Sequence, residues 1–294
     1  MKAIIVSAGV GSRLGELTKN TPKSLIDVNG QSILGRQIST FKKLGIFDIT
    51  VIIGPHVEKY SFENISFIHD KNYLSLDILS SLMLSRSIMH EDLIISYGDV
   101  IFDEQILQPL INFKGSIGLG IDFGWEKNYD GQRQGLKDEA TTVQIKNNVC
   151  TKIIDGKEHK KSKNQNASKF SNSENQQIGE FVGLMRLSKH GSTIFIKRYE
   201  ELINSHTGAF HEAISISQAY FSDMLQELVD NHIEILPISV QGKWCEIDTI
   251  EDLKRAKDIF LNHTLFWIFN NSFHRTSSIS SPEPIKLLFS VGSF

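Results

Sequence analysis

The sequence predicts an α/β protein in which a mostly parallel central sheet is flanked by helices and joined to a smaller antiparallel lobe. Short apolar runs rich in β-branched residues have the length of buried strands, and helical patterns separate several of them. In the second half of the chain the pattern changes to hairpin signals. The strands expected in the parallel sheet are residues 3–7, 49–53, 66–69, 93–97 and 116–121.

The first half of the chain follows a strand and helix alternation. Apolar residues recur at helical spacing between residues 34 and 41, and Gly45 follows as the expected residue just beyond the helix end. The strand at 49–53 then completes a βαβ unit, whose crossover is right-handed. A second helix is expected near residues 76–88, before the fourth strand.

The second half of the chain predicts antiparallel pairing. Residues 140–146 and 149–155 alternate in character around an Asn147-Asn148 turn, which is typical of a hairpin. The elements expected after this hairpin are helices near 188–203 and 216–231, a strand at 233–240, a short strand ending at Ile247 and a helix over 250–260.

These elements predict one domain over residues 1–260. Within it, residues 157–177 contain almost no apolar side chains, so burial cannot offset their ordering entropy and we expect a mobile loop. From Leu261 onward aromatic and apolar residues mix with Ser-rich turns, and two prolines near residue 283 break any helix. Residues 261–294 are therefore expected to be a tail appended to the domain.

Composition narrows the class of protein. Of the 294 residues 40% are hydrophobic and 22% are charged, which is ordinary globular usage. The formal net charge of −3, without a dense basic face, disfavours a nucleic-acid partner and favours small ligands. Cys150 and Cys245 lack metal-ligand spacing, and the first apolar run is too short for a signal or a membrane span. We expect a soluble cytoplasmic protein; whether it is a homo-oligomer is left open.

A glycine-rich loop follows the first strand, where ligands of open α/β sheets gather. Gly9 and Gly11 let backbone N–H groups close around phosphate oxygens. Leu14 stands where a dinucleotide fingerprint has its third glycine, and the Gly-Lys-Ser/Thr end of a P-loop is missing. Taken alone, the loop is equally consistent with a turn whose Arg13 is solvated.

A second cation favours a phosphate-binding loop over a simple turn with a solvated arginine. Lys23, in Thr21-Pro22-Lys23, lies ten residues after Arg13 on the same excursion, and two cations can flank one triphosphate. Gly-x-Gly-Ser-Arg-Leu followed by Thr-Pro-Lys resembles the GT-A-like, MobA-like nucleotidyltransferases of sugar 1-phosphates and phosphocholine. The resemblance implies a Rossmann-like GT-A fold, with Arg13 against the β and γ phosphates and Lys23 stabilising charge at the α-phosphorus. The nucleotide-binding residues it implies are Ala8, Gly9, Gly11, Ser12, Arg13 and Lys23.

Two aspartates are the candidate metal ligands. Phosphoryl-type transfer depends on positioning and on cations that neutralise charge, and Mg²⁺ prefers hard oxygen ligands. Asp99 follows the strand at 93–97, and Asp248 precedes the expected helix at 250–260. Both match the metal aspartates of the resembled family, which makes them catalytic candidates with Arg13 and Lys23. A turn former at Asp99 and a helix N-cap at Asp248 are the alternatives.

Three further stretches, residues 75–103, 179–184 and 220–227, resemble the phosphonate cytidylyltransferases associated with phosphoenolpyruvate mutase. The resemblance covers about residues 1–260. It implies transfer of CMP from CTP, with release of pyrophosphate, to aminoethylphosphonate, hydroxyethylphosphonate or a phosphocholine-like acceptor. The sequence departs from the pattern at Tyr97, where some relatives have an acid, at Glu16, and at Leu76-Asp77-Ile78.

The acceptor is expected to contact a loop beyond the strand at 116–121. Arg133 can grip phosphonate oxygens bidentately, and Tyr129 lies in the same loop. Glu180, in Gly179-Glu180-Phe181, is the candidate for orienting an acceptor amine or hydroxyl. A solvated arginine and a charge at a strand start are the alternatives. Trp244, beside a buried strand, is expected in the core.

Three other functions share parts of this pattern. A sugar-1-phosphate nucleotidylyltransferase would use UTP or dTTP with the same loop. A GT-A glycosyltransferase is disfavoured, because a nucleotide sugar has no γ-phosphate for Arg13 and Lys23 to engage. A non-catalytic nucleotide-binding module is disfavoured because the cations and both aspartates are intact.

Overall fold

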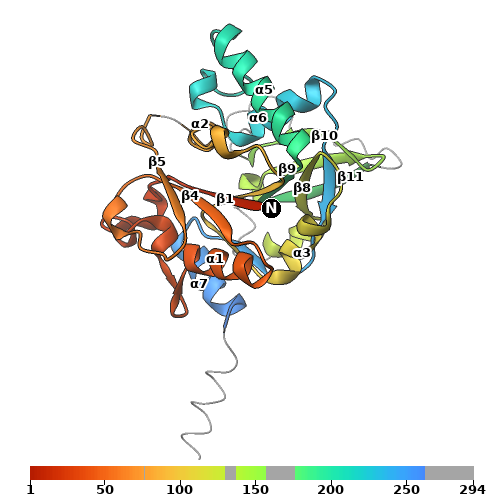
Figure 1. Ribbon diagram of the computed structural model, residues 1–294. Coiled ribbons are helices and arrows are strands. Elements are labelled where there is room, and N and C mark those ends of the chain that lie inside the picture. The colour runs from red at the N-terminus through yellow and green to blue at the C-terminus, as the bar shows by residue number, and fades with distance from the viewer. Residues whose placement is uncertain (76, 130–136, 157–175, 262–294) are drawn as a thin grey trace, which may run out of the picture. The chain divides into compact units, whose positions relative to one another are not determined.

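The computed structural model describes residues 1–75, 77–129, 137–156 and 176–261 (Figure 1). Residues Met1–Phe260 form one compact unit. The polar loop expected at 157–177 lies outside the described residues except at its last two positions, and so does the tail beyond Leu261. Among the described residues, no helix combines the length and the apolar character that crossing a membrane requires.

The parallel half of the sheet has the first strand at its centre. Strand β1 (Lys2–Ser7) pairs in parallel with β4 (Asp48–Ile53) on one side and β6 (Leu93–Tyr97) on the other, and β5 (Ser66–His69) continues from β4. These strands match the expected ones to within a residue. The apolar runs of β1, β4 and β6 are buried because helices cover both faces of the sheet, whereas Phe67 and Ile68 of the edge strand β5 are half-buried.

The antiparallel half continues the same nine-stranded sheet rather than forming a sheet of its own. Its centre is β11 (Gln176–Leu187), which runs antiparallel to β6 and to β8 (Ile117–Asp122). Strand β12 (Leu236–Ser239) pairs in parallel with β8 at this edge. The sheet is therefore mixed. The strand expected at 116–121 in the parallel sheet is β8, which pairs in antiparallel fashion with β11 and in parallel with β12.

The expected hairpin is present beside β11. Strands β9 (Thr142–Lys146) and β10 (Val149–Ile154) pair in antiparallel fashion around Asn147 and Asn148. Both asparagines have positive φ, at 52° and 62°, which is the backbone that a two-residue hairpin turn requires and that asparagine tolerates. Strand β9 also pairs with β11, so the hairpin is held to the main sheet.

Helices cover the two faces of the sheet (Figure 1). On one face lie α1 (Ile33–Lys43) and α3 (Glu104–Asn112), and their apolar sides share one core cluster with β1 and β4. The second cluster, on the other face, packs the helices α2 (Ile78–Met83), α5 (Lys189–Ser205) and α6 (Phe221–Asp230). Ser32 caps the start of α1 by accepting a hydrogen bond from Gly35 N.

Two expected helices are shorter than the sequence pattern predicted. The one expected at 76–88 ends at Met83 within α2, and a separate 3-10 turn at Arg86–Ile88 follows. The one expected at 216–231 starts only at Phe221, because Tyr220 and Asp223 form a capping box. In both cases hydrogen bonds at the helix ends override an apolar periodicity that extends further.

A separate two-stranded sheet lies next to the candidate residues Asp99 and Asp248. Strand β7 (Val100–Phe102) follows β6 after a tight turn and pairs in antiparallel fashion with β13 (Trp244–Glu246). The helix after β13 is α7 (Ile250–Ile259). A further small ribbon joins β2 (Asp27–Val28) to β3 (Gln31–Ser32). The sequence pattern anticipated β13 and α7 but neither β7 nor α3.

Candidate active site

The glycine loop after β1 lies directly on the stem of Lys23. Gly11 has φ of 67°, and a Cβ at this position would be 2.9 Å from Lys23 Cβ. A side chain at Gly11 would therefore be strained and would collide with the lysine. Lys23 itself starts a 3-10 turn after Pro22, which directs its side chain under the loop.

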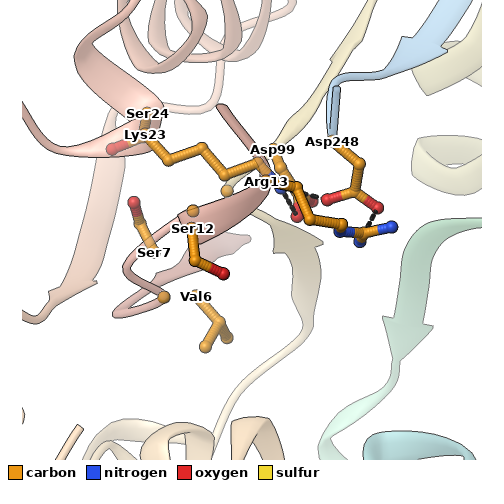
Figure 2. A pocket seen from close by; sticks show the side chains of 11 residues that line it. Val6, Ser7, Ser12, Arg13, Lys23, Ser24, Asp99 and Asp248 are labelled. Carbon is orange, nitrogen blue, oxygen red and sulfur yellow. Dashed lines mark hydrogen bonds and ion pairs between the residues drawn. The ribbon is translucent and has the colours of Figure 1, made fainter. Parts of the chain in front are cut away.

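Two cations and two aspartates meet beside this loop (Figure 2). Lys23 Nζ lies 2.8 Å from Asp99 Oδ2 and also donates a hydrogen bond to Asp248 Oδ1. Arg13 pairs with Asp248 Oδ2 and with Glu139 Oε2, the latter at 2.9 Å. The catalytic candidates Arg13, Lys23, Asp99 and Asp248 are thus brought together, although 225 residues separate Lys23 from Asp248.

The pKa shifts follow from this pairing. Burial alone would lower the pKa of Lys23, but the adjacent Asp99 and Asp248 outweigh it and raise the pKa above its ordinary value. Burial alone would raise the pKa of Asp248, but Lys23 and Arg13 lower it. These groups are therefore charged at neutral pH.

Glu246 joins the two aspartates as a third carboxylate, which the sequence interpretation missed. One carboxylate oxygen from each of Asp99, Glu246 and Asp248 lies within 4.8 Å of the others. Burial, reinforced by Asp248 and Asp99, raises the pKa of Glu246 well above its ordinary value. The sequence contained a signal for this residue: Glu246 and Asp248 are two residues apart, and side chains two apart in an extended segment point to the same side.

The short ribbon explains how this cluster forms. Asp99 lies in the turn before β7, and Glu246 ends β13 opposite Val100. Ile247 N donates to the Asp99 carbonyl at 2.9 Å, which fixes the two segments side by side. Asp248 then precedes α7, where Thr249 and Asp252 form a capping box.

The carboxylate cluster suits a hard divalent cation. All three ligand groups supply oxygen, the donor that Mg²⁺ prefers. Asp99 Oδ1 is buried and has no hydrogen-bond partner among the described residues, so it is an acceptor whose burial is not compensated. The donor set therefore fits a magnesium ion.

A cavity of about 260 Å³ lies between the glycine loop and the cluster (Figure 2). It is lined by the loop residues Gly9, Gly11 and Ser12, and by the two cations and two aspartates described above. Ala8, also expected to bind the nucleotide, is buried and does not line this cavity. A Cβ on Gly54 would come within 2.2 Å of the Ala8 carbonyl oxygen, so these two backbone segments pack directly together.

A second cavity, of about 300 Å³, adjoins the first and shares Gly9, Arg13, Asp99 and Asp248 with it. Its walls combine aromatic rings with carboxylates. The aromatic residues are Tyr97, Tyr129, Tyr220 and Phe221, and the additional carboxylates are Asp77, Glu139, Asp155, Glu246 and Asp252. No local pattern in the sequence distinguishes Glu139 or Asp155, because only the fold brings them to this wall.

The three residues expected to bind the acceptor differ in their position relative to the second cavity. Tyr129, in the 3-10 helix η5 (Trp125–Tyr129), lines the second cavity and donates a hydrogen bond from its hydroxyl to Glu180 Oε1. Glu180 is buried and contacts the cavity wall through Tyr129 rather than lining it. Arg133 lies outside the described residues, as does Leu76, whereas Asp77 and Ile78 line the cavity.

A polar network links the helix η5, which contains Tyr129, to β13 and α7 beside the carboxylate cluster. Asp122 Oδ2, at the end of β8, accepts hydrogen bonds from Trp244 Nε1 at 2.9 Å and from Asn128 Nδ2 at 3.3 Å. Asn128 in turn accepts from Arg255 of α7 at 3.0 Å. Trp244 is buried, as expected, but its indole N–H also links β13 to β8.

The chain is similar in sequence to several known nucleotidyltransferases. Residues 3–116 match the MobA-like NTP transferase domain. The chain is 26% identical over 267 residues to the CTP:phosphoglutamine cytidylyltransferase of Campylobacter jejuni, an alignment that covers 86% of this chain and 98% of that protein. It is 32% identical over 114 residues to the 2-aminoethylphosphonate cytidylyltransferase of Lancefieldella rimae, covering 36% of this chain and 46% of that one.

The fold is shared with a solved structure. The CTP:phosphocholine cytidylyltransferase of Streptococcus pneumoniae superposes with a TM-score of 0.62 at 17% identity, covering 88% of this chain and 98% of that chain. At this level of identity the comparison shows a common α/β architecture, with the same mixed central sheet flanked by helices.

Proposed function

Because this chain belongs to the nucleotidyltransferases that carry a MobA-like NTP transferase domain, we propose that it transfers CMP from CTP to a small phosphonate or phosphomonoester and releases pyrophosphate. The observation that carries the proposal is the junction of two cations and three carboxylates beside the glycine loop. CTP is proposed as the donor because the relatives described above are named as cytidylyltransferases. We expect the activity in the cytoplasm, where nucleoside triphosphates are available.

In the proposed reaction an oxygen of the acceptor's phosphonate or phosphate attacks the α-phosphorus of CTP. The bond from that phosphorus to the bridging oxygen of the β-phosphate breaks, and pyrophosphate leaves. Little covalent help is needed from the protein, so positioning and charge neutralisation dominate. Lys23 and Arg13 line the first cavity and supply fixed positive charge where the phosphate oxygens would lie.

Magnesium is proposed as the cofactor. Asp99, Glu246 and Asp248 would hold the ion, and when bound it would neutralise charge on phosphate oxygens. The chain's own part is to keep the carboxylates converged. The β7 and β13 pairing and the capping box at the start of α7 do this.

The second cavity supports an acceptor that carries an ammonium group. Carboxylates on several walls favour a cation, and the aromatic residues Tyr97, Tyr220 and Phe221 line the same cavity, where a ring face would attract one. Aminoethylphosphonate and phosphocholine carry such a group, whereas hydroxyethylphosphonate does not. Tyr129, Glu180 and Arg133 remain the proposed acceptor residues, with Glu180 acting through the Tyr129 hydroxyl.

Pyrophosphate release from each of the four nucleoside triphosphates tests the proposal. The acceptors to be compared are 2-aminoethylphosphonate, 2-hydroxyethylphosphonate, phosphocholine, phosphoglutamine and glucose 1-phosphate. We expect CTP to be preferred at least about tenfold, since a mismatched buried polar contact to the base costs about 1–3 kcal/mol. The variant Asp248→Asn is the control for contaminating activity and should lose most turnover. Preference for UTP or dTTP with glucose 1-phosphate would replace the proposal with a sugar-1-phosphate nucleotidylyltransferase.

A further inference from the structure

We propose that the acceptor reaches past the second cavity into a third, and that its amino group is carried on an alkyl chain longer than that of aminoethylphosphonate. This inference rests on the proposed CMP transfer and specifies the class of its acceptor. The third cavity is not part of the site described above.

The third cavity has a volume of about 260 Å³ and lies between two loops. One loop, residues 72–77, precedes α2, and the other, residues 206–220, joins α5 to α6. Asp77 and Tyr220 line both this cavity and the second one, so the two cavities are adjacent. An acceptor that extends past these two side chains reaches the third cavity.

Two highly exposed apolar side chains line this cavity. Leu74 is 79% exposed and Ile214 is 76% exposed, the highest values among the large apolar residues in the described part of the chain. They come from different loops, far apart in the sequence, and meet at one concave surface. Apolar side chains gathered in this way beside a candidate active site favour contact with a ligand.

Hydrogen bonds hold both loops in place. The buried Asp70 accepts hydrogen bonds from Asn72 N at 2.8 Å and from Ser81 Oγ at 2.6 Å, which fixes the start of the first loop. In the second loop Phe210 and Ala213 exchange two backbone hydrogen bonds of 2.9 Å. The cavity is therefore formed before a ligand binds, which lowers the entropic cost of binding.

The charged groups of the third cavity favour an amino group. Its carboxylates are those of Asp77 and Glu212, and among the described residues no lysine, arginine or histidine lines it. An ammonium group would be attracted by these carboxylates, and the methylene groups before it would pack on Leu74 and Ile214. The lining thus matches an aminoalkyl chain in both charge and apolar character.

Isothermal titration calorimetry with ω-aminoalkylphosphonates of two to five carbons tests the inference without turnover. The titrations are made with and without a non-hydrolysable CTP analogue. We expect the dissociation constant to fall about threefold for each methylene that reaches the apolar side chains. In the double variant Leu74→Ser with Ile214→Ser, the advantage of the five-carbon over the two-carbon compound should shrink to about twofold or less. Phe47→Ser removes an exposed apolar side chain elsewhere and is the matched control, which should keep the advantage.

The variant Glu212→Gln tests the preference for an amino group. Five-carbon phosphonates that end in an amine or in a hydroxyl are compared with each protein. The wild-type protein should prefer the amine about threefold, as expected for one exposed ion pair, and the variant should lose this preference.

A dissociation constant that does not fall with chain length, or that falls equally in the double variant, would overturn the inference. Undetectable binding of the whole series, with and without the CTP analogue, would do the same. Because calorimetry needs no bond transfer, these outcomes are separate from a failure of the pyrophosphate assay, which would contradict CMP transfer itself.

Discussion

Within the cluster of Asp99, Glu246 and Asp248, burial and the neighbouring carboxylates raise the pKa of Glu246 well above its ordinary value. A carboxyl group with a raised pKa in the folded state binds its proton more tightly there than in the unfolded chain. Its contribution to stability is therefore present at low pH and is lost as pH rises above the unfolded pKa of about 4.3. Glu246 thus opposes folding at neutral pH.

We predict that Glu246→Gln raises the melting temperature at pH 7 to 8 while lowering CMP transfer. The amide removes the cost of keeping this buried carboxyl group protonated at neutral pH and keeps a donor for Asp248, but it is a poorer metal ligand. Melting curves between pH 4 and pH 8 should show the advantage of the variant shrinking as pH falls. Glu126→Gln, at an exposed position of η5, is the matched control and should show no such trend. A variant less stable than the wild-type protein at pH 7 would contradict the argument.

At the residue scale, the sequence predicted those residues that belong to short motifs. Lys23 and Asp99 belong to recognisable sequence motifs, and the structure places both beside Asp248. Glu246 could have been predicted from its spacing to Asp248. Glu139 could not, since its role depends on contact with Arg13 across 126 residues of chain, which leaves no local trace.

The end of β8 and the strand β13 are held together by the network around Asp122. Through Trp244 this carboxylate reaches the strand that ends in Glu246, and through Asn128 it reaches η5, next to Tyr129. The proposed acceptor wall is therefore positioned relative to the carboxylate cluster by hydrogen bonds between elements. Neither Asp122 nor Trp244 needs to contact a substrate for this role.

We predict that Trp244→Phe raises the KM for the acceptor about threefold to tenfold and leaves the KM for CTP unchanged. Phenylalanine keeps an aromatic ring but loses the N–H donor, and one hydrogen bond contributes about 1 kcal/mol, or roughly fivefold. Steady-state kinetics with each substrate varied in turn measures the split. Lys127→Ala, on the same 3-10 helix, is the control and should change neither KM. Equal changes in both KM values would instead point to a general loss of structure.

At the element scale, long buried strands were predictable and short or interrupted elements were not. Residues 49–53 form an apolar run that only a covered strand explains. Strand β7 has only three residues, which is too few to show the two-residue periodicity of a strand. Helix α3 contains Pro109, and a proline at such a position predicts that a helix is interrupted. Both were missed because tertiary packing, rather than local preference, stabilises them.

The compact unit Met1–Phe260 contains the sheet, both of its helix layers and the candidate site. The Campylobacter jejuni relative aligns over 98% of its own length with 86% of this chain. These two observations support the proposal that residues beyond about 262 are not needed for the fold.

We predict that a chain ending at Asn262 keeps a cooperative melt within a few degrees of the full chain and keeps CMP transfer. The physical reason is that, within the described part of the chain, residues before Leu261 already form extensive buried core clusters. Differential scanning calorimetry and the pyrophosphate assay measure the two properties. Aggregation or a broadened transition would show that the removed residues belong to the core.

The pairing of β7 with β13 has a consequence for how this protein is made. Lys23 and Asp99 emerge from the ribosome long before Asp248, which follows Lys23 by 225 residues. Closing so long a loop carries a large entropic cost that later contacts must offset. A nascent chain can therefore form the glycine loop and the parallel strands while Glu246 and Asp248, two of the three clustered carboxylates, are still missing. On the proposed function, such an incomplete chain would lack two of its metal ligands and would not yet transfer CMP.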